Sequence, residues 1–228
     1  MKMKYSFILT SLIIIIITSC KSKIEEPIFN GKDLSNWTFF LKTPANPDSV
    51  FSVVDSMIQI TGQPFGYMRS KKEYSNYKLH LEYRWLSTPA NSGIFLHVKG
   101  EDKIWPLCYE CQLMNSRAGD IILMGVGMGL TVKDSVYSVQ EGKKNIVSPK
   151  FDFTNEKPAG EWNSIDITCN EDNIEIIFNG LLQNKGSGLT SATGAICLQS
   201  EGGPIQFRNI YLRSLGLPVV CGQPETSQ

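Results

Sequence analysis

An excess of positive charge is missing from this 228-residue sequence. Its 22 lysine and arginine residues are balanced by 22 aspartate and glutamate residues, so the net charge is zero. Two of the lysines, Lys2 and Lys4, precede an apolar leader, and the rest of the chain is therefore slightly acidic. Proteins that bind nucleic acid need a basic stripe that displaces counterions from phosphates. We therefore expect no nucleic-acid partner.

Helical periodicity and nucleotide-binding loops are also missing. Outside the leader, no window of twelve or more residues repeats its apolar positions every 3.6 residues. The glycine-rich segment 125–129 lacks both the Lys-Ser/Thr of a P-loop and the following helix of a dinucleotide-binding turn. No Ser-His-Asp spacing or nucleophile elbow occurs. These absences argue against helical bundles, nucleotide-binding folds and serine hydrolases.

The leader itself indicates secretion. A basic start is followed by the apolar run 7–17, which is shorter than the ~20 residues of a membrane span. The run ends in Ile-Thr-Ser-Cys, the pattern before which bacterial lipoprotein signal peptidase cuts. This pattern predicts a signal peptide over 1–19, then a lipidated Cys20 and a tether over 20–27. The protein would be anchored in the envelope of a Gram-negative bacterium, periplasmic or on the cell surface. The alternative is an ordinary signal peptide that ends near a cysteine by chance.

Five of the six cysteines follow Cys20, an odd number for an oxidising compartment. Cys108 and Cys111 form a C-x-x-C pair, but no second pair or nearby histidine has zinc-site spacing. On an extended strand, residues three apart point to opposite faces of the sheet. We therefore expect these cysteines to be buried apolar side chains rather than a disulfide or a metal site.

The dominant pattern in the sequence is an alternation with a period of two. It is clearest over 77–85, 164–169 and 173–180, and the last segment ends in Asn-Gly, a hairpin turn signal. Further strands are expected at 50–54, 57–61, 65–70, 93–98, 108–114, 120–124, 194–199 and 204–212. A short helical turn is expected at 33–37. These patterns predict an all-β fold, an antiparallel β-sandwich or jelly roll over 28–214, with a loose tail over 215–228.

Polar side chains on several predicted strands suggest a binding face. Alternation places Gly93, Phe95 and His97 on one face of a strand, and Glu110 and Gln112 on one face of the next. The same rule groups Ala195, Cys197, Gln199 and Glu201, while Gln206 and Arg208 lie on the last strand. Together they would form a polar floor for a polyhydroxylated ligand, with Trp105 at its rim to stack on a sugar ring. Trp162 is expected in the core or at a corner.

Several motifs, in order and spacing, resemble the 3-keto-disaccharide hydrolase domain family. The first, over 29–37, reads Phe-Asn-Gly-Lys-Asp-Leu-Ser-Asn-Trp. The others are segments 67–74, 91–95, 160–164, 179–180 and 198–210. The resemblance covers about residues 27–213. It implies a secreted, concanavalin A-like jelly roll, a fold that in this family often belongs to lipoproteins.

The resemblance also implies cleavage of glycosidic bonds in sugars already oxidised at C3. A ketone at C3 acidifies the C2 proton, so a base can remove that proton while the aglycone leaves C1. Hydration of the resulting glucal completes a net hydrolysis. An upstream sugar 3-oxidoreductase would have to supply such a substrate.

Residues in the matched motifs take roles by this resemblance. His97 is expected as base or acid, with Glu110 as its partner. Arg69, Asn91, Gln112, Gln199, Glu201 and Arg208 are expected to bind or orient the sugar. Many family members carry arginine where His97 stands. Whether His97 and Glu110 also hold a divalent cation stays open, because two residues do not make a metal site.

Two other classes of function remain open at this point. The chain could be a non-catalytic carbohydrate-binding surface lipoprotein on the same fold, or a structural domain whose polar face meets a protein. An enzyme predicts a deep pocket in which His97 and Glu110 come within hydrogen-bond reach. A binding module predicts a shallow platform with exposed tryptophan or tyrosine.

Overall fold

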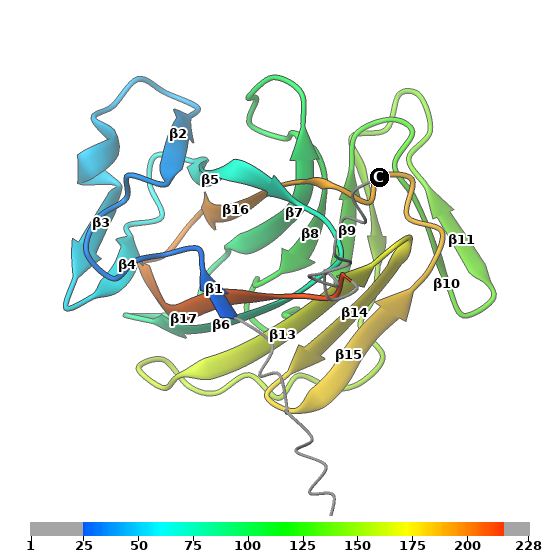
Figure 1. Cartoon of the computed structure of the whole chain (residues 1–228). Helices are drawn as coiled ribbons and strands as arrows, with labels where there is room; N and C mark the ends of the chain where they lie inside the picture. Colours follow the sequence, from blue (N-terminus) through cyan, green and yellow to red (C-terminus); the bar gives the residue numbers. More distant parts are fainter. Residues whose placement is uncertain (1–24, 217–228) are drawn as a thin grey trace, which may run out of the picture.

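The computed structural model describes residues 25–216, which form two antiparallel sheets packed face to face (Figure 1). One sheet has the order β15 (Leu181–Gly186), β14 (Asn173–Phe178), β13 (Asn163–Asn170), β6 (Tyr77–Trp85), β17 (Ile205–Ser214), β4 (Met57–Ile60) and β3 (Phe51–Val54), and β1 (Glu25–Pro27) also pairs with β17. The other has the order β12 (Asn145–Ser148), β9 (Ile121–Met124), β8 (Leu107–Gln112), β7 (Gly93–Lys99), β16 (Gly194–Ser200), β5 (Gly66–Tyr74) and β2 (Trp37–Leu41). A separate hairpin joins β10 (Gly129–Val132) and β11 (Ser135–Ser138), and η1 (Pro47–Ser49) is a 3-10 turn.

The predicted antiparallel β-sandwich is confirmed. Every strand expected from the alternation coincides with a strand of the structure, and β6 spans the predicted residues 77–85. Along β6, buried residues alternate with half-buried ones, as they do along β13 from its first residue to Cys169. This alternation is the consequence of one sheet face lying on the core. The shorter strands β2, β12 and β15 and the β10–β11 hairpin were not predicted.

The ends of the predicted domain need two corrections. Residues 25–27, expected to belong to the tether, form β1 and pair with Tyr211–Arg213 of β17. The segment 33–37 forms a tight turn rather than a helix, in which the Trp37 N–H donates to the Leu34 carbonyl over 3.0 Å. The signal peptide, Cys20 and most of the tail lie outside the described residues. Within the described residues, no helix is long and apolar enough to cross a membrane.

The core between the sheets is aromatic where β6 crosses it. Tyr83 and Trp85 are almost fully buried, yet both carry a polar group that needs a partner. Glu156, in the connection between β12 and β13, supplies it: one carboxylate oxygen accepts from the Tyr83 hydroxyl over 2.7 Å and from the Trp85 indole N–H over 2.9 Å. This contact fastens the connection to the core.

The four cysteines among the described residues are buried, as the sequence predicts. Cys108 packs in an apolar cluster on the outer side of its sheet, whereas Cys111 packs in the core between the sheets. Both are buried free thiols, as are Cys169 and Cys197. Burial raises the pKa of each of these thiols, and that of Cys169 rises to about 12.

These four thiols are therefore expected to resist alkylation in the folded protein. Only the thiolate reacts, and here it is both inaccessible and disfavoured. Iodoacetamide at pH 8, followed by peptide mass spectrometry, should label them at least roughly 100-fold more slowly in native buffer than in denaturant. Reductant should leave the melting temperature unchanged. Rapid native labelling of Cys108 or Cys197 would contradict this packing.

Candidate functional site

The outer face of the seven-stranded sheet carries the predicted site residue Glu110. We call this surface, which points away from the core, the Glu110 face. The strand register places one row of side chains across it, from β5 to β12: Arg69, Cys197, Phe95, Glu110, Ile122 and Val147. A second row contains Tyr67, Gln199, Gly93 and Gln112, and Glu201 follows two residues after Gln199.

Much of the Glu110 face is apolar, which corrects the expectation of a polar floor. A cluster separate from the main core covers it, made of Tyr67, Phe95, Val98, Cys108, Ile122, Met124, Ala195 and Cys197. Trp105, expected at the rim, is partly buried against this cluster together with Phe40 and Val147. A polar group on this face therefore has few partners that can replace water.

Glu110 is the charged residue most affected by these surroundings. Only 4% of it is exposed, and within residues 25–216 no hydrogen-bond donor reaches its carboxylate. The carboxylate fits only because residue 93 is glycine: a Cβ there would lie 2.0 Å from Glu110 Oε1. Burial raises the pKa of Glu110 to about 8, with a further contribution from the negative charge of Glu201.

Two amide side chains, those of Gln199 and Asn91, lie toward the second row of side chains. Gln199 Nε2 donates to Glu201 Oε2 over 2.7 Å, while Gln199 Oε1 is buried without a partner. Asn91 makes isolated backbone bridges to Glu201 and Gly202, and its Oδ1 is also buried without a partner. Two buried amide oxygens close to Glu201 in the chain or in the bridge pattern thus have no hydrogen-bond partner among the described residues.

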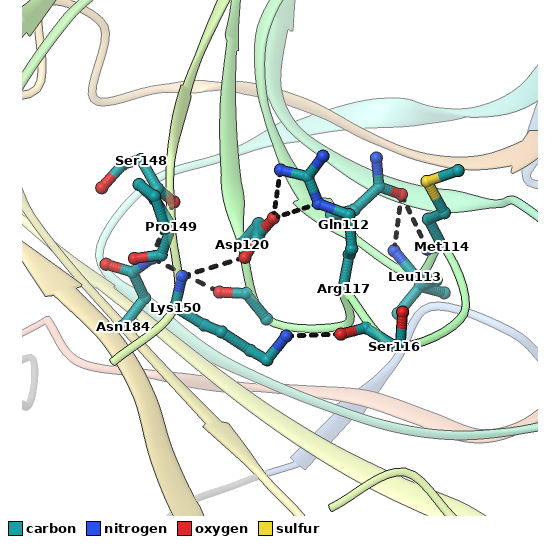
Figure 2. Close-up of polar contacts among 11 residues, drawn as sticks. Gln112, Leu113, Met114, Ser116, Arg117, Asp120, Ser148, Pro149, Lys150 and Asn184 are labelled. Atoms are coloured by element: carbon teal, nitrogen blue, oxygen red, sulfur yellow. Dashed lines mark hydrogen bonds and ion pairs between the residues drawn. The ribbon is translucent and has the colours of Figure 1, made fainter. Parts of the chain in front are cut away.

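Gln112 is held rigidly by the turn that follows β8 (Figure 2). Its Oε1 accepts from the N–H groups of Leu113 and Met114, over 2.9 and 2.8 Å, which leaves its amide N–H groups as the available donors. The turn is closed by Asp120, which is buried and accepts from Arg117 Nε over 2.8 Å and from the Lys150 N–H over 2.9 Å. The sequence did not predict that Lys150 contacts this turn, because no sequence motif connects the two segments.

Arg69 is engaged by the loop between β7 and β8. Its Nη1 donates to the Gly100 carbonyl over 3.1 Å and to Asp102 Oδ1 over 3.0 Å, and the Tyr67 hydroxyl donates to the same oxygen over 3.0 Å. The loop is therefore fastened across β16 to β5, over part of the Glu110 face. Asp102 and Tyr67 were not predicted, because only the strand register shows that they meet.

The expectation that His97 shares a face with Gly93 and Phe95 is wrong. The register of β7 against β8 shifts between Leu96 and Lys99, and His97 has φ 56°, so a bulge turns its side chain to the opposite face. There its ring packs against Tyr77 and Tyr109, with centroids 5.7 and 6.4 Å away.

His97 therefore does not converge with Glu110. Its Nδ1 donates to the Ser191 carbonyl over 2.9 Å, and burial lowers its pKa. The two residues cannot share a cation from opposite faces of the sheet. Within the described part of the chain, no three His, Cys, Asp or Glu side chains are grouped as metal ligands.

Arg208 also lies away from Glu110. It belongs to β17 of the other sheet, on the outer face, where its Nε donates to Glu82 Oε2 over 2.5 Å. Its guanidinium lies 3.9 Å from the Trp162 ring centroid, and the Arg84 guanidinium lies 4.6 Å from the same centroid. Of the two expected positions for Trp162, core or corner, the core is wrong: it is half-buried and directly precedes the first residue of β13. The site thus combines Glu110, Gln112, Gln199, Glu201 and Asn91, with Arg69 at its far side.

The fit between Gly93 and Glu110 predicts a coupled effect on stability. Gly93→Ala should destabilise the protein by about 1–3 kcal/mol, because the new methyl group must displace a buried carboxylate. The same substitution in a Glu110→Ala background should cost less than about 0.5 kcal/mol. A double-mutant cycle by urea unfolding checks this expectation. Additive effects of the two substitutions would show that the residues do not compete for space.

The raised pKa of Glu110 predicts a pH-dependent stability. A carboxyl with pKa about 8 when folded and about 4.5 when unfolded stabilises the fold fully below pH 4.5. This stabilisation is lost as the pH rises through 8. The melting temperature of the wild type should therefore fall relative to that of Glu110→Gln, by roughly 5 °C or more between pH 5 and 9. Parallel melting curves for the two proteins would contradict the burial of this carboxyl.

The fold recurs in proteins of carbohydrate metabolism. Two crystal structures of candidate glycosyl hydrolases from Parabacteroides distasonis share it. One is 20% identical, with a TM-score of 0.62 over 84% of this chain and 94% of that one. The other is 24% identical, with a TM-score of 0.60 over 84% and 100%. A Bacillus licheniformis β-glucanase shares the fold at 11% identity and a TM-score of 0.53, over 84% and 97%.

These structures confirm the predicted concanavalin A-like sandwich, and at such identities they establish the fold alone. No functionally curated protein matches the chain in sequence. Residues 25–213 match the family model of the 3-keto-alpha-glucoside-1,2-lyase-like domain. The match runs from the first residue of β1 to the penultimate residue of β17, and so covers the whole sandwich. The chain therefore belongs to the family of 3-keto-α-glucoside-1,2-lyase-like domains.

Proposed function

We propose that this protein cleaves the glycosidic bond of 3-keto-glycosides, by removal of the C2 proton and elimination of the aglycone from C1. Family membership supports a glycoside substrate. The observation that carries the proposal is the buried carboxyl of Glu110, on a face bordered by unpaired amide oxygens. A titratable group whose pKa lies near neutrality, beside groups that bind hydroxyls, is the arrangement that proton transfer on a sugar requires.

The chemistry suits a site without a bound cation. A C3 ketone makes the C2 hydrogen acidic, so a side-chain base of ordinary strength can remove it. The product is a 3-keto-glucal, to which water adds at C1. The apolar cluster around Glu110 provides a low-dielectric environment that strengthens electrostatic interactions in the site. Asn91, Gln112 and Gln199 supply polar groups that can pair with sugar hydroxyls.

The Glu110 face is less suited to a carbohydrate-binding module. A module of that kind presents exposed aromatic rings on which sugars stack. On this face Tyr67 and Phe95 are fully buried, and Phe40 and Trp105 are partly buried. An almost fully buried carboxyl without a hydrogen-bond donor is suited to proton transfer, and the stacking of sugars on aromatic rings does not require it. These features favour catalysis at Glu110.

The test is the release of free sugar from the 3-keto forms of methyl α- and β-glucoside. The wild type should cleave at least one of them and should leave the unoxidised glucosides intact. Glu110→Gln should lose this activity by at least roughly 100-fold, the usual contribution of a positioned acid or base. Glu175→Gln is the matched control, because Glu175 pairs with Lys185 on the other sheet. Equal losses in both variants, or cleavage of the unoxidised glucosides, would contradict the proposal.

A further inference from the structure

A second carboxyl, that of Glu201, lies at the same site as Glu110. Glu201 follows β16 on the strand face that carries Gln199, and its backbone bridges to that of Asn91, two residues before Gly93. The Glu110 carboxylate fills the space in front of Gly93, while Gln199 bonds the Glu201 carboxylate. The two acidic side chains thus approach the same part of the sheet from β8 and β16.

Their surroundings differ in a way that separates their protonation states. Glu201 is half-buried, and its Oε2 accepts a hydrogen bond from Gln199, which favours the ionised form. Glu110 is buried without such a donor and faces the charge of Glu201, which favours the protonated form. Both pKa values are raised, and in Glu201 the Gln199 hydrogen bond opposes the rise.

The other ionisable groups around the pair leave this contrast in place. The thiols of Cys108 and Cys111 are buried and uncharged at neutral pH. On the turn after β8, the Asp120 carboxylate is paired with Arg117. Arg69, on β5, is paired with Asp102 of the β7–β8 loop, and His97 faces the opposite side of the sheet. Within residues 25–216, no salt bridge joins a cation to either carboxyl.

We propose that Glu201 is the catalytic base and Glu110 the catalytic acid of the cleavage reaction. This division of roles rests on the function proposed above. When the surroundings of two titratable groups at one site disfavour ionisation unequally, the ionised one can accept a proton while the neutral one donates.

The Glu201 carboxylate takes the C2 proton, and the electrons of the C2–H bond form a C1=C2 double bond. The C1–O bond breaks, and the leaving oxygen takes the proton of Glu110. Water then adds to C1, giving one proton to the Glu110 carboxylate, while Glu201 returns its proton to C2. Both residues regain their starting states, and the net change is hydrolysis.

Two substrates with different leaving groups separate the two roles. The 3-keto-glucoside of methanol needs a proton on its leaving oxygen, whereas that of 4-nitrophenol does not. The experiment uses the purified full chain. In Glu110→Gln, release of methanol should fall at least roughly 100-fold, while release of 4-nitrophenol should fall less than roughly 10-fold. In Glu201→Gln, both should fall at least roughly 100-fold.

The pH dependence provides a second readout that a purely structural role would not change. For the methyl substrate, kcat/KM of the wild type should decline above about pH 8, where free Glu110 loses its proton. The decline should be weak for the 4-nitrophenyl substrate. Melting temperatures show whether each variant folds. Glu201→Asp keeps the carboxylate and should therefore recover part of the activity that is lost in Glu201→Gln.

Each outcome separates the two proposals. If Glu110→Gln loses both substrates equally, or if Glu201→Gln retains more than a tenth of the wild-type rate, the division of roles is wrong although cleavage stands. If the wild type cleaves neither 3-keto substrate, the proposed function itself fails.

Discussion

The site depends on one steric and electrostatic fit, the burial of the Glu110 carboxylate in front of Gly93. A carboxyl in apolar surroundings is costly unless it stays protonated, and here no donor or cation offsets the loss of water. The missing side chain of Gly93 provides the space, and Phe95 and Ile122 flank Glu110 in the strand register. The fold thereby produces a group that can hold and release a proton near neutral pH.

The sandwich architecture could be predicted because its physical cause is local. A strand with one buried face must alternate between apolar and polar residues. The strands at 77–85 and 164–169 could therefore be identified from the spacing of their apolar residues alone. The same rule correctly placed Cys108 and Cys111 on opposite faces. The edge strands β2 and β12 were not predicted because buried and exposed residues do not alternate along them.

Two errors at the site have causes that alternation cannot reveal. One extra residue in β7 shifts the register before Lys99, and every expectation based on period two fails beyond it, which misplaced His97. Arg208 was misplaced for a different reason. Alternation says which side chains share a face of a strand, but not which sheet the strand joins, and β17 joins the sheet opposite Glu110.

The corrected site rests on side chains whose neighbours come from distant strands. Gln199 shows why this matters for catalysis: it bonds Glu201, and its strand lies two positions from the strand of Glu110. That hydrogen bond adds to the difference in burial between the two carboxyls, because it favours the anion of Glu201 alone. A hydrogen bond to one acid and the burial of the other are enough to make them chemically unequal. The antiparallel sheet holds that difference in place without a metal ligand set among the described residues.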